Sequence, residues 1–210
     1  MGKVEFAICF AIALIVASGL KHTSAFAQTS QDWARCLLGD LSTPDVPIDG
    51  CTVVIKTGDQ ILRNLATAYN NRGVAYRTRT NYAEAIDDFN EAIRLVPNNA
   101  SAFNNRGVAY RNIADLDRAV ADYDQAIHIK PDYIAAFYNR GLALSDKREY
   151  AKAISDFSTV LRVDPKNPVV LYRRGTAYLK SGDIEAGNGD LAEAKAIKPD
   201  IEKDIARGGP

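Results

Sequence analysis

The chain repeats itself with a period of 34 residues. The segment YNNRGVAYR at residues 69–77 recurs as FNNRGVAYR at residues 103–111, and related segments follow at 137–145 and 171–179. One glycine and one proline keep strict register with this period: Gly73, Gly107, Gly141 and Gly175, and Pro97, Pro131, Pro165 and Pro199. A fixed period of about 20 to 50 residues is typical of solenoids, whose units pack on their neighbours. The nonapeptide is therefore expected to be a structural building block and not a catalytic motif.

Each unit contains two stretches in which apolar residues recur at helical spacing. In the first unit, Tyr69 and Tyr76 belong to one stretch and Phe89 to the other, with the polar segment 78–81 between them. Pro97 should end the second helix, because proline cannot continue the helical hydrogen-bond pattern. The recurring glycine should let the second helix approach closely, and we expect it to face the alanines of that helix: Ala85, Ala119 and Ala153.

This pattern resembles the tetratricopeptide repeat, which places an aromatic residue, Leu, Gly, Tyr, Ala, Phe, Ala and Pro at fixed offsets. In register, the repeats are 66–99, 100–133, 134–167 and 168–201. The resemblance implies an all-α, right-handed α-solenoid of about four helix pairs. The chain departs from the family pattern where Arg replaces Leu and where Gly187 replaces the alanine of the fourth repeat. Because Gly187 and Gly189 lower helix propensity, the last helix should be the least stable.

The first 27 residues have the features of a secretory signal peptide. An apolar run from Phe6 to Ala17 follows an early lysine, and the residues Ala25 to Ala27 form a small-residue cleavage site. We expect cleavage before Gln28 and a periplasmic or secreted protein of a Gram-negative bacterium. The alternative is an uncleaved membrane anchor, although the run is shorter than the roughly 20 apolar residues that a span requires.

Two cysteines, Cys36 and Cys51, lie beyond the signal. An even number of cysteines in an exported protein favours a disulfide, and two buried free thiols are the alternative. Residues 28–65 are expected to form a degenerate, disulfide-linked capping repeat, because Cys51 lies 34 residues before Ala85. Residues 202–210 should form a C-terminal tail.

The composition argues against several classes of function. The chain has 26 basic and 26 acidic residues, so no basic excess indicates a nucleic-acid partner. Beyond the signal, His128 is the only histidine, and no G-x-S-x-G, H-E-x-x-H or phosphate-binding loop is present. We therefore expect no catalytic residues, no metal and no cofactor, and no membrane insertion once the signal is cleaved.

Two charged residues also follow the repeat period. Arginine holds one position and aspartate another: Arg72, Arg106, Arg140 and Arg174, and Asp88, Asp122, Asp156 and Asp190. An arginine column could bind an acidic ligand. The alternative is that each arginine packs its stem between helices and pairs with an aspartate. The equal counts and identical period favour this structural role.

The resemblance also suggests a binding surface, because the first helices of tetratricopeptide repeats line a concave groove. The expected groove residues occupy the fifth and sixth repeat positions: Asn70, Asn104, Tyr138 and Tyr172, and Asn71, Asn105, Asn139 and Arg173. A ladder of asparagines can both donate to and accept from the backbone of an extended peptide. It is similar to the asparagine ladder of the O-linked N-acetylglucosamine transferase family. Alternatively, these asparagines serve the helix interfaces.

These observations predict a non-enzymatic scaffold that binds an extended peptide segment of another protein in its groove. The alternative is an assembly subunit of an envelope complex that contacts its partners through the edges of the solenoid. The two-carboxylate clamp of chaperone-binding members needs lysines that this chain lacks: Ala135 and Asn104 stand at such positions. Chaperone tails are therefore not implied as partners.

Overall fold

The computed structural model describes residues 30–37, 43–57 and 61–207, and this part of the chain contains helices, turns and loops but no strand. Residues 30–37 are helical. The helices that follow are α2 (Asp45–Thr57), α3 (Leu62–Thr78), α4 (Tyr82–Leu95), α5 (Ala100–Asn112), α6 (Leu116–Ile129), α7 (Ile134–Asp146), α8 (Tyr150–Val163), α9 (Pro168–Ser181), α10 (Ile184–Ile197) and α11 (Ile201–Ala206). The expected signal peptide lies outside the described residues.

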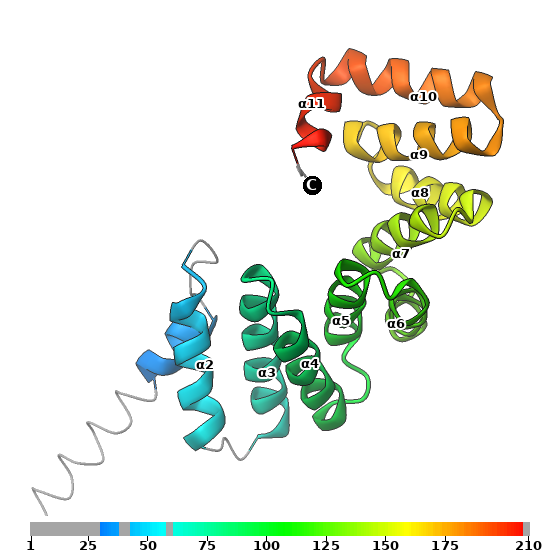
Figure 1. The fold of residues 1–210 in the computed structure, drawn as a ribbon. Coiled ribbons are helices and arrows are strands. Elements are labelled where there is room, and N and C mark those ends of the chain that lie inside the picture. The colour runs from blue at the N-terminus through cyan, green and yellow to red at the C-terminus, as the bar shows by residue number, and fades with distance from the viewer. Residues whose placement is uncertain (1–29, 38–42, 58–60, 208–210) are drawn as a thin grey trace, which may run out of the picture.

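The helices form successive pairs along a curved path, from α2 at one end to α10 and α11 at the other (Figure 1). Each helix packs mainly on the helices before and after it in the sequence. The first helices of successive pairs also touch one another: α3 with α5, α5 with α7, and α7 with α9. This closer spacing puts the first helices on the inner side of the curve. The structure confirms the predicted all-α solenoid.

An aromatic ring fills the space beside the recurring glycine. A Cβ atom at Gly73 would lie 2.7 Å from the ring of Phe89, although real Cβ atoms do not approach other atoms so closely. The same contact joins Gly107 to Tyr123 and Gly141 to Phe157. The expectation that the glycines face the alanines was therefore wrong. Ala85 is also fully buried, but the atoms nearest to the glycine belong to the larger ring of Phe89.

Cys36 and Cys51 form a disulfide, which confirms the expected pairing. The expected register of this unit was wrong, however. The buried residues of α2 are Pro47, Gly50, Cys51 and Val54. Those of α4 have the same spacing: Ala85, Asp88, Phe89 and Ala92. By this match Cys51 corresponds to Phe89, one helical turn further along than the sequence period implied.

The disulfide therefore takes the place of the contact between glycine and an aromatic ring in the later units. Arg72 supports this register, because its Nη1 donates to Thr52 of α2, 20 residues away. The matching bond from Arg106 reaches Asn90, 16 residues away. The difference of four residues again equals about one helical turn.

The last helix pair, α9 and α10, has smaller residues on its second helix than the earlier pairs have. Gly187 is buried, and a Cβ atom there would lie 2.6 Å from Leu179. Gly189, two residues later, has nothing within 4 Å of such an atom. The short helix α11 then packs on α9, with Ile201 fully buried (Figure 1). The two glycines thus have different surroundings, which the sequence pattern alone did not separate.

Candidate functional site

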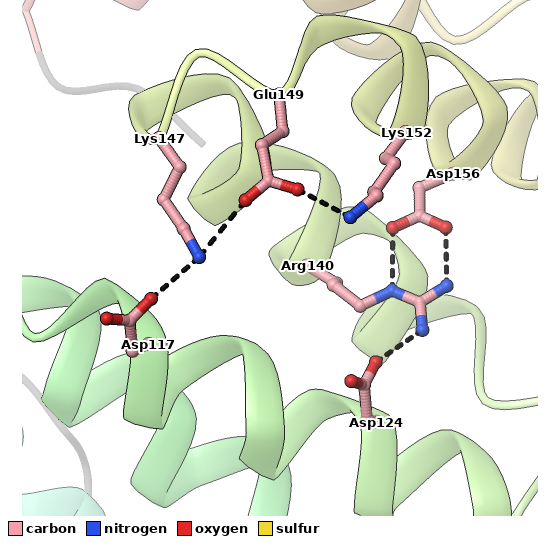
Figure 2. Close-up of polar contacts among 7 residues, drawn as sticks. All are labelled: Asp117, Asp124, Arg140, Lys147, Glu149, Lys152 and Asp156. Atoms are coloured by element: carbon pink, nitrogen blue, oxygen red, sulfur yellow. Dashed lines mark hydrogen bonds and ion pairs between the residues drawn. The ribbon is translucent and has the colours of Figure 1, made fainter.

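Each arginine of the periodic column joins three helices. Arg106 on α5 donates from Nε and Nη2 to both oxygens of Asp122 on α6, at 2.8 and 2.6 Å. Its Nη1 donates to Asn90 on the preceding α4 at 2.7 Å. Arg140 makes the same contacts, with Asp156 and with Asp124 (Figure 2). These hydrogen bonds raise the pKa of the Arg140 guanidinium, so it stays charged.

The aspartates of these pairs are buried, and the guanidinium groups are covered. Asp122 is 5% exposed. The guanidinium carbon of Arg106 lies 5.4 Å from the ring centre of Phe103 and 5.8 Å from that of Tyr110, within the range of a cation–π contact. The arginine column is therefore occupied by the fold itself. This supports the structural interpretation of the column.

A second ionic network lies beside Arg140, around a cleft of about 320 Å³ between α6, α7 and α8. The ammonium group of Lys147 contacts Asp117 at 2.6 Å and Glu149 at 3.1 Å. Glu149 also pairs with Lys152 at 2.7 Å (Figure 2). Because cations and carboxylates alternate around this cleft, their charges compensate one another. The cleft offers no evident excess charge to a ligand.

The asparagines of the inner face link neighbouring first helices. The amide nitrogen of Asn139 on α7 donates to the amide oxygen of Asn104 on α5 at 2.9 Å. Likewise, Asn105 on α5 donates to Asn70 on α3 at 3.0 Å. Asn104 is only 5% exposed, so its side chain serves mainly the helix interface. These asparagines therefore do contribute to the interfaces between neighbouring first helices, which was the alternative to a role in ligand binding.

The series continues to the disulfide. Asn70 donates to Asn71 at 3.4 Å, and Asn71 donates to the backbone carbonyl of Cys36 at 3.3 Å. The amide nitrogens of four of these asparagines thus have acceptors inside the protein: Asn70, Asn71, Asn105 and Asn139. In contrast, the amide oxygens of Asn105 and Asn139 receive no hydrogen bond within the described part of the chain. These half-buried side chains keep one free acceptor each.

The ladder changes at its C-terminal end. Tyr138 and Tyr172 take the place of Asn70 and Asn104, and the ring of Tyr138 packs against Phe157 at a centroid distance of 6.1 Å. Arg173 takes the place of the donor asparagines. Its Nε is buried without a hydrogen-bond partner in the described part of the chain, and the equivalent of the accepting asparagines is here Tyr138, which has no amide oxygen. The expected groove residues are therefore all on the first helices, but they are not equivalent.

Three further residues have buried polar atoms without a hydrogen-bond partner among the described residues: Nε of Arg77, the hydroxyl of Tyr123 and Oγ of Ser145. Burial raises the pKa of Tyr123, whose side chain is fully buried. Burial also lowers the pKa of Arg77. The expected site did not include Tyr123. The signal for it was available, because tyrosine stands here at the position that phenylalanine holds in the units before and after it.

Other kinds of site find no support in the described residues. None of their helices is long and apolar enough to cross a membrane. They also contain no group of three or more His, Cys, Asp or Glu side chains placed to hold a metal ion. His128 is exposed on α6, as an ordinary surface residue would be.

Comparisons with known proteins agree with the fold. The family model described as TPR repeat matches residues 75–112, and the model described as tetratricopeptide repeat matches residues 100–133 and 134–167. No curated protein matches the sequence.

Solved structures resemble the chain more extensively. The structure of YrrB, described as a TPR protein with an unusual peptide-binding site, is 22% identical with a TM-score of 0.66, covering 82% of this chain and 87% of YrrB. A structure of MamA is 21% identical with a TM-score of 0.67, covering 77% of this chain and 92% of MamA. MamA from Desulfovibrio magneticus RS-1 is 23% identical with a TM-score of 0.63, covering 68% of this chain and 85% of that protein's chain. At these identities the likeness concerns the fold. The repeat period, the solenoid of helix pairs and the two family models together show that the chain belongs to the tetratricopeptide repeat family.

Proposed function

We propose that this protein is a non-enzymatic scaffold that binds an extended peptide segment of another protein along the inner face of α3, α5, α7 and α9. The family fold suggests a role in protein–protein interaction. The description of YrrB names a peptide-binding site in a protein of the same fold. For this chain, the finer assignment depends on its own inner-face residues.

The observation that carries the proposal is the pair of free amide oxygens at Asn105 and Asn139. They occur one repeat apart, on α5 and α7. Each amide is held by the hydrogen bond that its nitrogen donates to the preceding first helix. Because these bonds already fix the side chains, a ligand that donates backbone N–H groups would lose less side-chain entropy on binding. Asn105 and Asn139 can therefore stabilise the helix interfaces and bind a peptide at the same time.

We also propose that the protein works outside the cytoplasm. The disulfide between Cys36 and Cys51 supports this location, because disulfides persist in oxidising compartments such as the periplasm. The signal-like segment 1–27 supports export on sequence grounds. Fractionation of cells that express the full chain, followed by immunodetection, would test it. Protein found only in the cytoplasm would contradict export.

A displayed library of random decapeptides, selected on the immobilised protein, provides a probe for the groove. An enriched peptide is then titrated against the double variant Asn105→Ala/Asn139→Ala. Each lost hydrogen bond should weaken binding by about 0.5–1.5 kcal/mol. The control is Gln125→Ala, which removes an exposed amide from the second helix α6.

Unchanged affinity in the double variant would move the binding site away from the inner face. The solenoid edges would then be the contact surface, as expected for an assembly subunit of an envelope complex. A selection that enriches no peptide above the level of an unrelated helical protein would contradict peptide binding altogether.

A further inference from the structure

The half-buried arginines of this solenoid divide into two groups. Five of them hold a carboxylate: Arg72 with Asp88, Arg106 with Asp122, Arg111 with Asp146, Arg140 with Asp156, and Arg174 with Asp190. The other two are Arg77 and Arg173, and within the described residues no carboxylate lies at ion-pair distance from either. Burying an unpaired charge is costly, so these two positions are not explained by the stability of the isolated solenoid.

The charge of Arg77 is not compensated within the described residues. Arg77 is on α3, one turn beyond Gly73, and its Nε is buried without an acceptor. The groups that act on its charge are the hydroxyls of Tyr82 and Tyr123, and neither is a carboxylate. Burial therefore dominates and lowers the pKa of Arg77. A carboxylate at this place would compensate the charge.

The hydroxyl of Tyr123 is a second, independent observation at the same place. The ring of Tyr123 packs on Gly107, and the side chain is fully buried. Its hydroxyl has no hydrogen-bond partner in the described part of the chain. The cations of Arg111 and Arg77 and the carboxylates of Asp122 and Asp146 lie close enough to affect its ionisation. A buried hydroxyl without a partner costs free energy comparable to a lost hydrogen bond. The Tyr123 hydroxyl is thus a hydrogen-bond donor without an acceptor, near the guanidinium group of Arg77, which has no carboxylate partner among the described residues.

Arg173 repeats the pattern at the other end of the inner face. It stands on α9 at the position that Asn105 and Asn139 hold on α5 and α7. Those asparagines donate to an amide on the preceding first helix. For Arg173 the equivalent position on α7 is Tyr138, which has no amide, and the Nε of Arg173 is buried without a partner among the described residues. The order of the first helices places Asn105 and Asn139 between Arg77 and Arg173.

We propose that the ligand of the inner face is an acidic peptide segment, with one carboxylate bound by Arg77 and another by Arg173 on either side of the asparagines. This proposal depends on the proposed peptide-binding function and specifies its ligand. Guanidinium groups suit this role because they bind carboxylates through two parallel hydrogen bonds. The peptide backbone between the acidic residues would donate to Asn105 and Asn139.

The decapeptide selection described above tests this proposal through the composition of the enriched pool. We expect enrichment of Asp and Glu at two separated positions. Replacing either acidic residue by its amide should weaken binding about 10-fold to 100-fold, the usual effect of losing a charged hydrogen bond. Arg77→Gln and Arg173→Gln should each lose a similar factor, and each should be insensitive to the matching amide peptide. A C-terminally amidated peptide should bind as well as the free acid, because the proposal assigns side-chain carboxylates.

The control is Arg94→Gln, which makes the same charge change at an exposed arginine of α4 and should leave affinity unchanged. The Tm of Arg77→Gln should not fall, because no internal ion pair is lost. Enriched peptides without acidic residues, equal binding by the arginine variants, or a strong preference for phosphoserine over glutamate would overturn the assignment of side-chain carboxylates while leaving peptide binding intact. A selection that enriches nothing would contradict the peptide-binding function itself.

Discussion

The amide nitrogen of Asn105 on α5 donates a 3.0 Å hydrogen bond to the amide oxygen of Asn70 on α3. One asparagine thus joins two repeats while its own oxygen stays free of any hydrogen bond from the described residues. Asn139 and Asn104 repeat this relationship one unit further on. The inner face is therefore part of the packing between repeats, and changes in that packing should affect binding.

The replacement of Asn70 by alanine should weaken peptide binding indirectly, through its effect on Asn105. Asn70→Ala deletes the acceptor of Asn105, so the Asn105 amide can rotate and its oxygen is no longer held in place. We expect stability to fall by about 0.5–1.5 kcal/mol, the net value of a hydrogen bond, with a several-fold loss of peptide affinity. Denaturant unfolding and peptide titration measure the two effects. Full affinity in this variant would show that the hydrogen bond does not orient Asn105.

Arg106→Ala should destabilise the protein and spare the binding surface. It leaves the buried Asp122 unpaired and removes the bond to Asn90, so we expect a loss of about 3–5 kcal/mol, as for other broken buried pairs. Arg94→Ala, which breaks an exposed pair with Glu91, should lower stability far less, because exposed ion pairs contribute little. Urea unfolding compares the two. A large loss of peptide affinity by folded Arg106→Ala protein would contradict its structural role.

The disulfide should stabilise the first unit locally. In the chain-entropy model, a bridge that closes a loop of about 15 residues contributes about 3 kcal/mol. The variant Cys36→Ser/Cys51→Ser should therefore speed amide hydrogen exchange in α2 and α3, while α7 to α10 stay protected, because solenoid units couple mainly to their neighbours. Free-thiol counting on the unreduced wild-type protein is the companion measurement. Two reactive thiols per chain would contradict the bond.

The two glycines of α10 should respond oppositely to alanine. Gly189→Ala should stabilise the protein by up to about 1 kcal/mol, since alanine is the better helix former and space is open there. Gly187→Ala should destabilise it despite the same gain in propensity, because its Cβ would meet Leu179 at 2.6 Å. Thermal unfolding of both variants is the measurement. Equal stabilisation by both would mean that Leu179 moves aside at little cost.

The periodic sequence predicted what each unit shares. Because all four pairs of repeat helices use the same glycine, arginine and aspartate positions, the spacing predicted the solenoid and favoured pairs between the arginines and the aspartates, such as that of Arg106 with Asp122. The contact of Gly73 with Phe89 did not, because the period relates equivalent residues in different units and does not specify which residues touch within one unit.

The features that differ between units were less predictable. The one-turn shift of α2 was hidden because Cys51 replaces an aromatic residue, so the first unit offers no side-chain match to the others. The linkage of Asn105 to Asn70 depends on the curvature that brings first helices together, and the period contains no information about curvature. The unpaired state of Arg77 likewise depends on what lies around it in three dimensions.

The most direct measurement of the central claim is NMR of the side-chain amides during titration with a selected decapeptide. If an extended peptide lies along the inner face, the side-chain amide signals of Asn105 and Asn139 should shift with a common Kd, because the peptide contacts the oxygen of each amide group. The signal of Gln125 on the second helix α6 should stay unchanged. Shifts confined to second helices, with Asn105 and Asn139 unmoved at saturation, would contradict binding in the groove.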